Sequence, residues 1–125
     1  MSSSHALINL EDYISSFLWK KRIVLLITKE KHINIINETD DFFSERNSCE
    51  NGSRNLKYIK IIGDDIDKYV VPDRYKNKYG IWLIGYDGGH KSYSANASLV
   101  KEIYNIIDRM PIRQSELVDQ SKRCG

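Results

Sequence analysis

The chain has 125 residues, of which 41 % are hydrophobic, enough for one globular domain with one core. Charged residues make up 29 % and the net charge is only +2, a balance too even to indicate nucleic-acid binding. No apolar run approaches the roughly 20 residues that cross a bilayer, so no membrane span is expected. The first residues, Met1–His5, lack the charged and then apolar pattern of a signal peptide.

The first part of the chain predicts a helix, a strand and a second helix. Residues Leu10–Leu18 place apolar side chains at helical spacing. The basic run Lys20–Arg22 follows and is interpreted as solvent-facing charge. Ile23–Ile27 is an unbroken run of β-branched residues and leucines, typical of a strand covered on both faces. Ile33–Arg46 then has a one-sided apolar stripe, which predicts an amphipathic helix.

The middle of the chain predicts a loop, a strand and a short helical turn. Asn47–Asn55 is polar and contains the turn signal Asn51–Gly52, so we expect a mobile loop. Leu56–Ile62 is the second predicted strand. Pro72 is well placed to open a short helix, because proline fits the first turn of a helix.

The last part of the chain predicts a hairpin and a helix. Ile81–Ile84 is an apolar strand, and the Asp87–Gly89 turn supplies the glycines that a tight hairpin to His90–Tyr93 requires. Ala97–Arg109 has the clearest helical period of the chain, and Pro111 is expected to end that helix.

A strand, a helix and a second strand favour a right-handed crossover with parallel pairing. With the hairpin and the returning helix, the order predicts an α/β protein with a thioredoxin-like three-layer sandwich. Its mixed four-stranded sheet would carry helices on both faces. We expect a single domain over residues 1–125, with residues 1–7 flexible and residues 114–125 either flexible or a short helix.

Redox chemistry is the first activity to test in such a fold. A dithiol enzyme needs a low-pKa cysteine after the first strand, at the start of the next helix. The chain has Thr28–Lys31 there, without a cysteine, and Asn77–Gly80 before the third strand, without a proline. Cys49 is interpreted as a buried thiol or as one half of a disulfide. We therefore predict no catalytic residue.

Other motifs in the chain have plainer explanations than chemistry. Gly85–Ser92 lacks the glycine that precedes the lysine of a phosphate-binding loop, so its glycines indicate a hairpin turn. The acidic segment Asp64–Asp67 lacks the glycine and the closing glutamate of a calcium loop. His90 beside Asp87 could form an acid–base pair, but a surface histidine at a turn is favoured. We predict no metal and no cofactor.

Three sequons predict glycosylation at Asn37, Asn51 and Asn96. Their number favours an extracellular protein.

Four segments together resemble a known family, the DUDES-type domain of unknown function. They are Trp19–Arg22, the region Cys49–Ile62, the stretch Gly80–Lys91 and the stretch Ile107–Glu116. This domain occurs in sushi-repeat-containing and equarin-like extracellular proteins of animals, and as small, often secreted bacterial proteins. The resemblance implies a thioredoxin-like, peroxiredoxin-related fold with no established enzymatic activity, and an extracellular or periplasmic location. The chain departs from the animal type because it carries no sushi repeats and no signal sequence.

From these observations we predict a non-catalytic binding or scaffold domain with a protein or matrix partner. The candidate surface is the Gly85–Lys91 turn together with the Met110–Arg113 segment, and its residues are Asp87, His90, Lys91 and Arg113. The alternative is a degenerate thioredoxin- or peroxiredoxin-like oxidoreductase.

Overall fold

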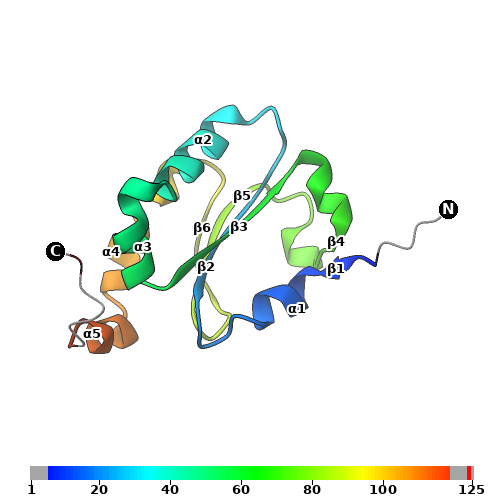
Figure 1. The fold of residues 1–125 in the computed structure, drawn as a ribbon. Helices are drawn as coiled ribbons and strands as arrows, with labels where there is room; N and C mark the ends of the chain where they lie inside the picture. Colours follow the sequence, from blue (N-terminus) through cyan, green and yellow to red (C-terminus); the bar gives the residue numbers. More distant parts are fainter. Residues whose placement is uncertain (1–5, 119–123, 125) are drawn as a thin grey trace.

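A computed structural model describes residues 6–118 and Cys124. A mixed four-stranded sheet lies at its centre, in the strand order β3-β2-β5-β6 (Figure 1). Strand β2 pairs parallel with β3 and antiparallel with β5, and β5 forms the hairpin with β6. The bounds are β2 Arg22–Thr28, β3 Leu56–Ile62, β5 Gly80–Ile84 and β6 His90–Ser94. The predicted α/β fold with a mixed four-stranded sheet is confirmed, and the arrangement is consistent with a thioredoxin-like sandwich.

Alternate residues of β2 enter two separate cores, one on each face of the sheet. Ile23, Leu25 and Ile27 pack in the core beneath α1, while Val24 and Leu26 pack in the core beneath α2 and α4. Figure 1 shows these helices on opposite sides of the sheet. Because both faces are covered, the central strand is apolar from Ile23 to Ile27. The helices are α1 Leu10–Ser15, α2 Ile33–Phe42, α3 Ser48–Ser53, α4 Ile103–Asp108 and α5 Pro111–Val118.

The expected loop over residues 47–55 is wrong, because most of it is helical. The 3-10 helix η1 covers Glu45–Asn47 and is followed directly by α3. The side-chain amides of Asn47 and Asn51 donate to the Phe42 carbonyl, at 3.1 and 2.8 Å. These polar side chains supply hydrogen-bond donors to a backbone carbonyl at the end of α2. The polarity of the segment therefore does not indicate a mobile loop.

Residues 63–75 contain more structure than the single helical turn expected at Pro72. The 3-10 helix η2 covers Gly63–Lys68, and η3 follows Pro72 over Asp73–Tyr75. Between them, β4 (Tyr69–Val70) pairs parallel with β1 (Ile8–Asn9) in a separate two-stranded sheet. Neither strand was predicted, because two residues are too few to show a period.

The helix predicted over Ala97–Arg109 is divided into the 3-10 helix η4, Ala97–Lys101, and helix α4. Pro111 ends that segment and also begins α5, which runs to Val118. Residues 114–118, for which a short helix was one of two expectations, are therefore helical. Residues 1–5, 119–123 and 125 lie outside the described residues.

Candidate functional site at the hairpin turn

The turn between β5 and β6 lies against the junction of α4 and α5, and a cavity of about 190 Å³ separates them. These two segments were predicted to share one surface, and both contribute residues to the lining of the cavity. Most of the cavity wall is apolar, and two cationic side chains reach it. The lining residues are Trp19, Arg22, Gly85, Tyr86, Asp87, Lys91, Met110, Pro111 and Ile112.

Trp19 forms one wall of the cavity in a backbone conformation that is unusual for a bulky residue. Its φ angle is 63°, in the left-handed region, where an L side chain costs about 1–2 kcal/mol. The conformation is held by the Trp19 N–H, which donates to the Tyr86 carbonyl at 2.9 Å. The indole is nonetheless 67 % exposed. Backbone strain of this kind clusters at functional sites, which makes the exposed Trp19 a candidate contact residue.

Arg22 opens strand β2 and is only 1 % exposed. Its Nη1 donates to the Arg54 carbonyl at 2.9 Å and to Glu116 Oε1 at 3.0 Å. Its guanidinium also lies 4.3 Å from the centre of the Tyr86 ring. The interpretation of Lys20–Arg22 as solvent-facing charge is therefore wrong for Arg22. The cause is long-range, because the covering groups come from α5 and from the residues after α3.

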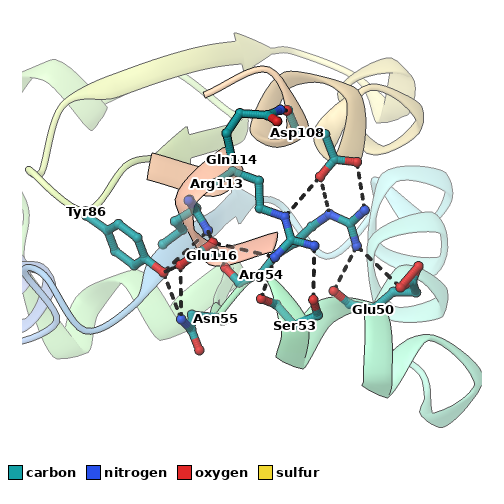
Figure 2. Close-up of polar contacts among 10 residues, drawn as sticks. Glu50, Ser53, Arg54, Asn55, Tyr86, Asp108, Arg113, Gln114 and Glu116 are labelled. Carbon is teal, nitrogen blue, oxygen red and sulfur yellow. Dashed lines mark hydrogen bonds and ion pairs between the residues drawn. The ribbon is translucent and has the colours of Figure 1, made fainter. Parts of the chain in front are cut away.

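Two more buried arginines extend this cluster away from the cavity (Figure 2). Arg54 holds both oxygens of Asp108, at 3.0 and 2.8 Å, and its guanidinium stacks 3.9 Å from the centre of the Tyr104 ring. Arg113 donates to the carbonyl and the hydroxyl of Ser53, at 2.8 and 3.0 Å, and reaches Asp108 at 3.3 Å. The cluster thus joins α3, α4 and α5 to the end of the sheet.

The carboxylates of the cluster are held ionised. Burial alone would raise the pKa of Glu116, but hydrogen bonds from Tyr86 and Arg22 and the nearby arginine charges outweigh it and lower that pKa. The same balance, with Arg54 and Arg113 as the donors, lowers the pKa of Asp108. Burial and the hydrogen bond to Glu116 raise the pKa of Tyr86, so its hydroxyl remains a donor.

The predicted surface residues divide between three places. Asp87 and Lys91 lie at the cavity and form an ion pair at 3.2 Å. His90 points elsewhere: its Nε2 lies 2.7 Å from the Tyr75 hydroxyl, and burial lowers its pKa, with further lowering by the charges of Arg74 and Lys78. Arg113 is 3 % exposed and belongs to the buried cluster, so it is not available to a partner in this structure.

Cys49 lies exposed in α3 and forms a disulfide with Cys124. The chain's two cysteines are therefore both engaged, and neither is a free thiol. Thr28, at the position of a thioredoxin-type cysteine, is buried, with its hydroxyl 2.7 Å from His32 Nδ1.

The three sequon asparagines differ in accessibility. Asn37 and Asn96 are exposed, whereas Asn51 is 6 % exposed and its amide nitrogen donates to the Phe42 carbonyl. Glycosylation at these sites remains a prediction, and Asn51 is the least suited of the three, because a glycan there would have to displace a buried contact.

Sequence reasoning missed two of the residues that line the cavity, Trp19 and Arg22, whereas the others, Tyr86 among them, lie in the two predicted segments. One signal was present in the chain: a tryptophan directly before a basic run places a flat apolar side chain beside cations. The left-handed backbone at Trp19 and the burial of Arg22 had no local signal.

The family comparison matches residues 13–116 to the model of the "Domain of unknown function (DUF4174)". The chain belongs to this family. The match contains the hairpin, the buried arginine cluster and the cavity, so the candidate site lies within the family domain. No curated protein and no solved structure matched the chain.

Two further observations concern metals and membranes. In residues 6–118 and Cys124, no group of three or more His, Cys, Asp or Glu side chains is placed to hold a metal ion. In that same part of the chain, no helix has the length and apolar character needed to cross a bilayer.

Proposed function

We propose that this member of the DUF4174 family is a non-catalytic binding domain of an exported protein. The observation that carries the proposal is the cavity where the hairpin turn meets the α4–α5 junction. It combines apolar walls, a strained and exposed Trp19, and the ion pair of Asp87 and Lys91 at its edge. The DUDES-type resemblance, with its extracellular proteins, is consistent with this role and supplies the expectation of a protein or matrix partner.

Two observations favour export. The Cys49–Cys124 disulfide is compatible with an oxidising compartment, where such bridges persist. Exposed sequons at Asn37 and Asn96 suit a eukaryotic secretory route. Location is tested by fractionating cells that express the full-length gene and by mass spectrometry of the exported fraction. Recovery of the reduced protein from the cytosol alone would contradict the proposal.

Two observations disfavour the oxidoreductase alternative. Both cysteines are joined to each other in the disulfide, between α3 and residue 124. Thr28 stands where a dithiol enzyme has its nucleophilic cysteine. Insulin reduction and peroxide consumption are measured for the wild type and for the Cys49→Ser/Cys124→Ser variant. We expect no turnover above buffer from either protein. Turnover by the wild type that the double variant lacks would overturn the non-catalytic assignment.

Binding is tested by partner capture from an extracellular or matrix fraction. Trp19→Ala and Asp87→Ala remove exposed groups at the cavity, and we expect both to lose the captured partner. Lys101→Ala, at an exposed position in η4, is the matched control and should retain it. Equal capture by all four proteins would remove the cavity as the contact site. Arg113→Ala is unsuitable, because it would break buried hydrogen bonds to Ser53.

A further inference from the structure

One edge of the Arg22 guanidinium lacks a hydrogen-bond acceptor. Nη1 serves the Arg54 carbonyl, Glu116 and, at 3.4 Å, the Tyr86 hydroxyl. Nε and Nη2 are buried, and neither has a partner in the part of the chain that the structure describes. Buried donors of a charged group are costly to leave unpaired, and folded proteins rarely do so without a reason.

The two unpaired nitrogens belong to the same edge of the guanidinium. The N–H bonds of Nε and Nη2 are parallel, and this pair of donors matches the two oxygens of a carboxylate. In the same cluster, Arg54 uses its own Nε and Nη2 to hold both oxygens of Asp108. Arg22 presents the same donor pair without the corresponding carboxylate.

The surroundings of Arg22 also favour an anion. Three buried guanidiniums, from Arg22, Arg54 and Arg113, share two carboxylates within 3.5 Å, from Asp108 and Glu116. Helix α5 begins at the cavity wall, and the positive end of its dipole adds to the attraction. Charge is nevertheless balanced nearby, because Glu50 lies 3.8 Å from Arg54 and Asp87 pairs with Lys91, so the preference for an anion rests on the unpaired Nε and Nη2 of Arg22.

The walls and the size of the cavity further restrict the chemical class of the ligand. Trp19, Tyr86 and Met110 offer aromatic and thioether surfaces. An enclosed apolar cavity of about 150 Å³ accommodates benzene, so about 190 Å³ leaves room for one ring and a carboxylate. Phosphate would fill the anion position but would leave the apolar walls unused.

We propose that this cavity binds a carboxylate carried on a small aromatic group, held in a bidentate manner by Nε and Nη2 of Arg22. The inference rests on the proposed binding function and specifies the chemistry of its ligand. The ring lies against Trp19 and Tyr86. Because Nε and Nη2 are closed off from solvent, a wall side chain must rotate on entry. Trp19 is two-thirds exposed, so its rotation costs little buried surface.

Such a carboxylate has two sources, a free aromatic acid or the C-terminus of a polypeptide that ends in an aromatic residue. Both present the same ring and carboxylate, and separate probes distinguish them. Phenylacetate and phenylacetamide represent the free acid and its neutral match. A short peptide ending in phenylalanine, with a free or an amidated C-terminus, represents the chain end. Inorganic phosphate tests for general anion binding.

The direct readout is the Arg22 Nε–H resonance in the NMR spectrum of the ¹⁵N-labelled wild-type protein. We expect phenylacetate or the free-acid peptide to move this resonance together with the Trp19 indole N–H. The matching amide should bind at least about tenfold more weakly, because it cannot accept both charged hydrogen bonds. This measurement needs no variant, so it does not depend on whether Arg22 substitutions fold.

Lys91→Gln and Lys101→Gln provide a matched pair of charge removals, one at the cavity and one away from it. We expect the Lys91 change to weaken phenylacetate binding by roughly two- to fivefold and the Lys101 change to have no effect. Equal weakening by both variants would indicate diffuse electrostatic attraction and would overturn the proposed site.

Three outcomes of the probe titrations overturn the inference. If acid and amide bind equally in the cavity, the carboxylate assignment fails while the proposed binding function stands. If phosphate moves the Arg22 resonance as strongly as phenylacetate does, the aromatic part fails. If none of the probes moves it, Arg22 is not a ligand-binding group, and the partner-capture experiment alone decides the proposed function.

Discussion

Arg54 and Asp108 form a two-point contact between the end of α3 and the end of α4: Nε donates to Oδ1 at 3.0 Å and Nη2 donates to Oδ2 at 2.8 Å. The same carboxylate also accepts from Arg113, so one acidic side chain pairs with two buried cations. The contact therefore links three short helices, α3, α4 and α5, of which α5 begins at the cavity. Alone, a helix of six to eight residues is not stable in water, so its position depends on contacts of this kind.

Asp108→Asn should lower the free energy of unfolding by about 2–3 kcal/mol, because each of two buried guanidiniums loses one of its charged acceptors. The measurement is urea denaturation followed by circular dichroism. Asp41→Asn is the matched control, since Asp41 pairs with Arg46 and both side chains are more than half exposed. That change should cost less than about 1 kcal/mol. Equal effects of the two substitutions would show that the buried cluster does not stabilise the fold.

The loss of stability at acid pH should depend on the same cluster. The folded pKa values of Asp108 and Glu116 lie below their ordinary values of 3.8 and 4.5. The folded state thus binds fewer protons than the unfolded state, so the contribution of these groups is complete above the ordinary values and is lost as pH falls through the folded ones. We expect the urea midpoint to be steady near neutral pH and to fall below about pH 4.5.

Two controls separate this effect from general surface charge. The fall should persist at about 1 M salt, where the Debye length is about 3 Å and exposed pairs are screened. Asp108→Asn should make the fall shallower, because one of the titrating groups is gone. A midpoint that does not change with pH down to about 3, or a fall that salt removes, would contradict the assignment.

The disulfide should contribute to stability through the unfolded chain. It joins residues 75 apart, so it closes a long loop in the unfolded state. Cys49→Ser/Cys124→Ser should lower the free energy of unfolding by about 2–4 kcal/mol. A reducing agent should bring the wild type to the level of the double variant and leave the double variant unchanged. A wild type that denatures identically with and without reductant would show that the bridge does not constrain the chain.

The sheet could be predicted because its information is local. Ile23–Ile27 and Leu56–Ile62 are runs of the right length and residue type, and the Asp87–Gly89 turn marks the hairpin. Each prediction depended on neighbours in sequence, and all three elements are present.

The burial of Arg22 and Arg113 could not be predicted, because it depends on partners far away in the sequence. Arg22 looked like surface charge beside Lys20 and Lys21, and it is buried because a carbonyl 32 residues away and a carboxylate 94 residues away accept from it. Arg113 was assigned to a contact surface for the same reason, since its buried partner Ser53 is 60 residues distant. No periodicity encodes such pairs.

Because Trp19 has a left-handed backbone, the usual stability order of alanine and glycine variants should reverse at this position. At φ 63°, alanine pays the cost of its Cβ and glycine does not, so Trp19→Gly should be more stable than Trp19→Ala by about 1 kcal/mol. At Glu38, exposed in α2, glycine should instead be less stable than alanine by about 1 kcal/mol. Urea denaturation of the four variants measures both differences.

Both Trp19 variants should lose partner capture to the same extent, because each removes the indole from the cavity wall. The backbone cost would then be separated from the role of the ring: stability would distinguish alanine from glycine, and binding would not. If alanine and glycine have the usual order at position 19, the left-handed conformation is not imposed by the fold, and the strain argument for the cavity fails.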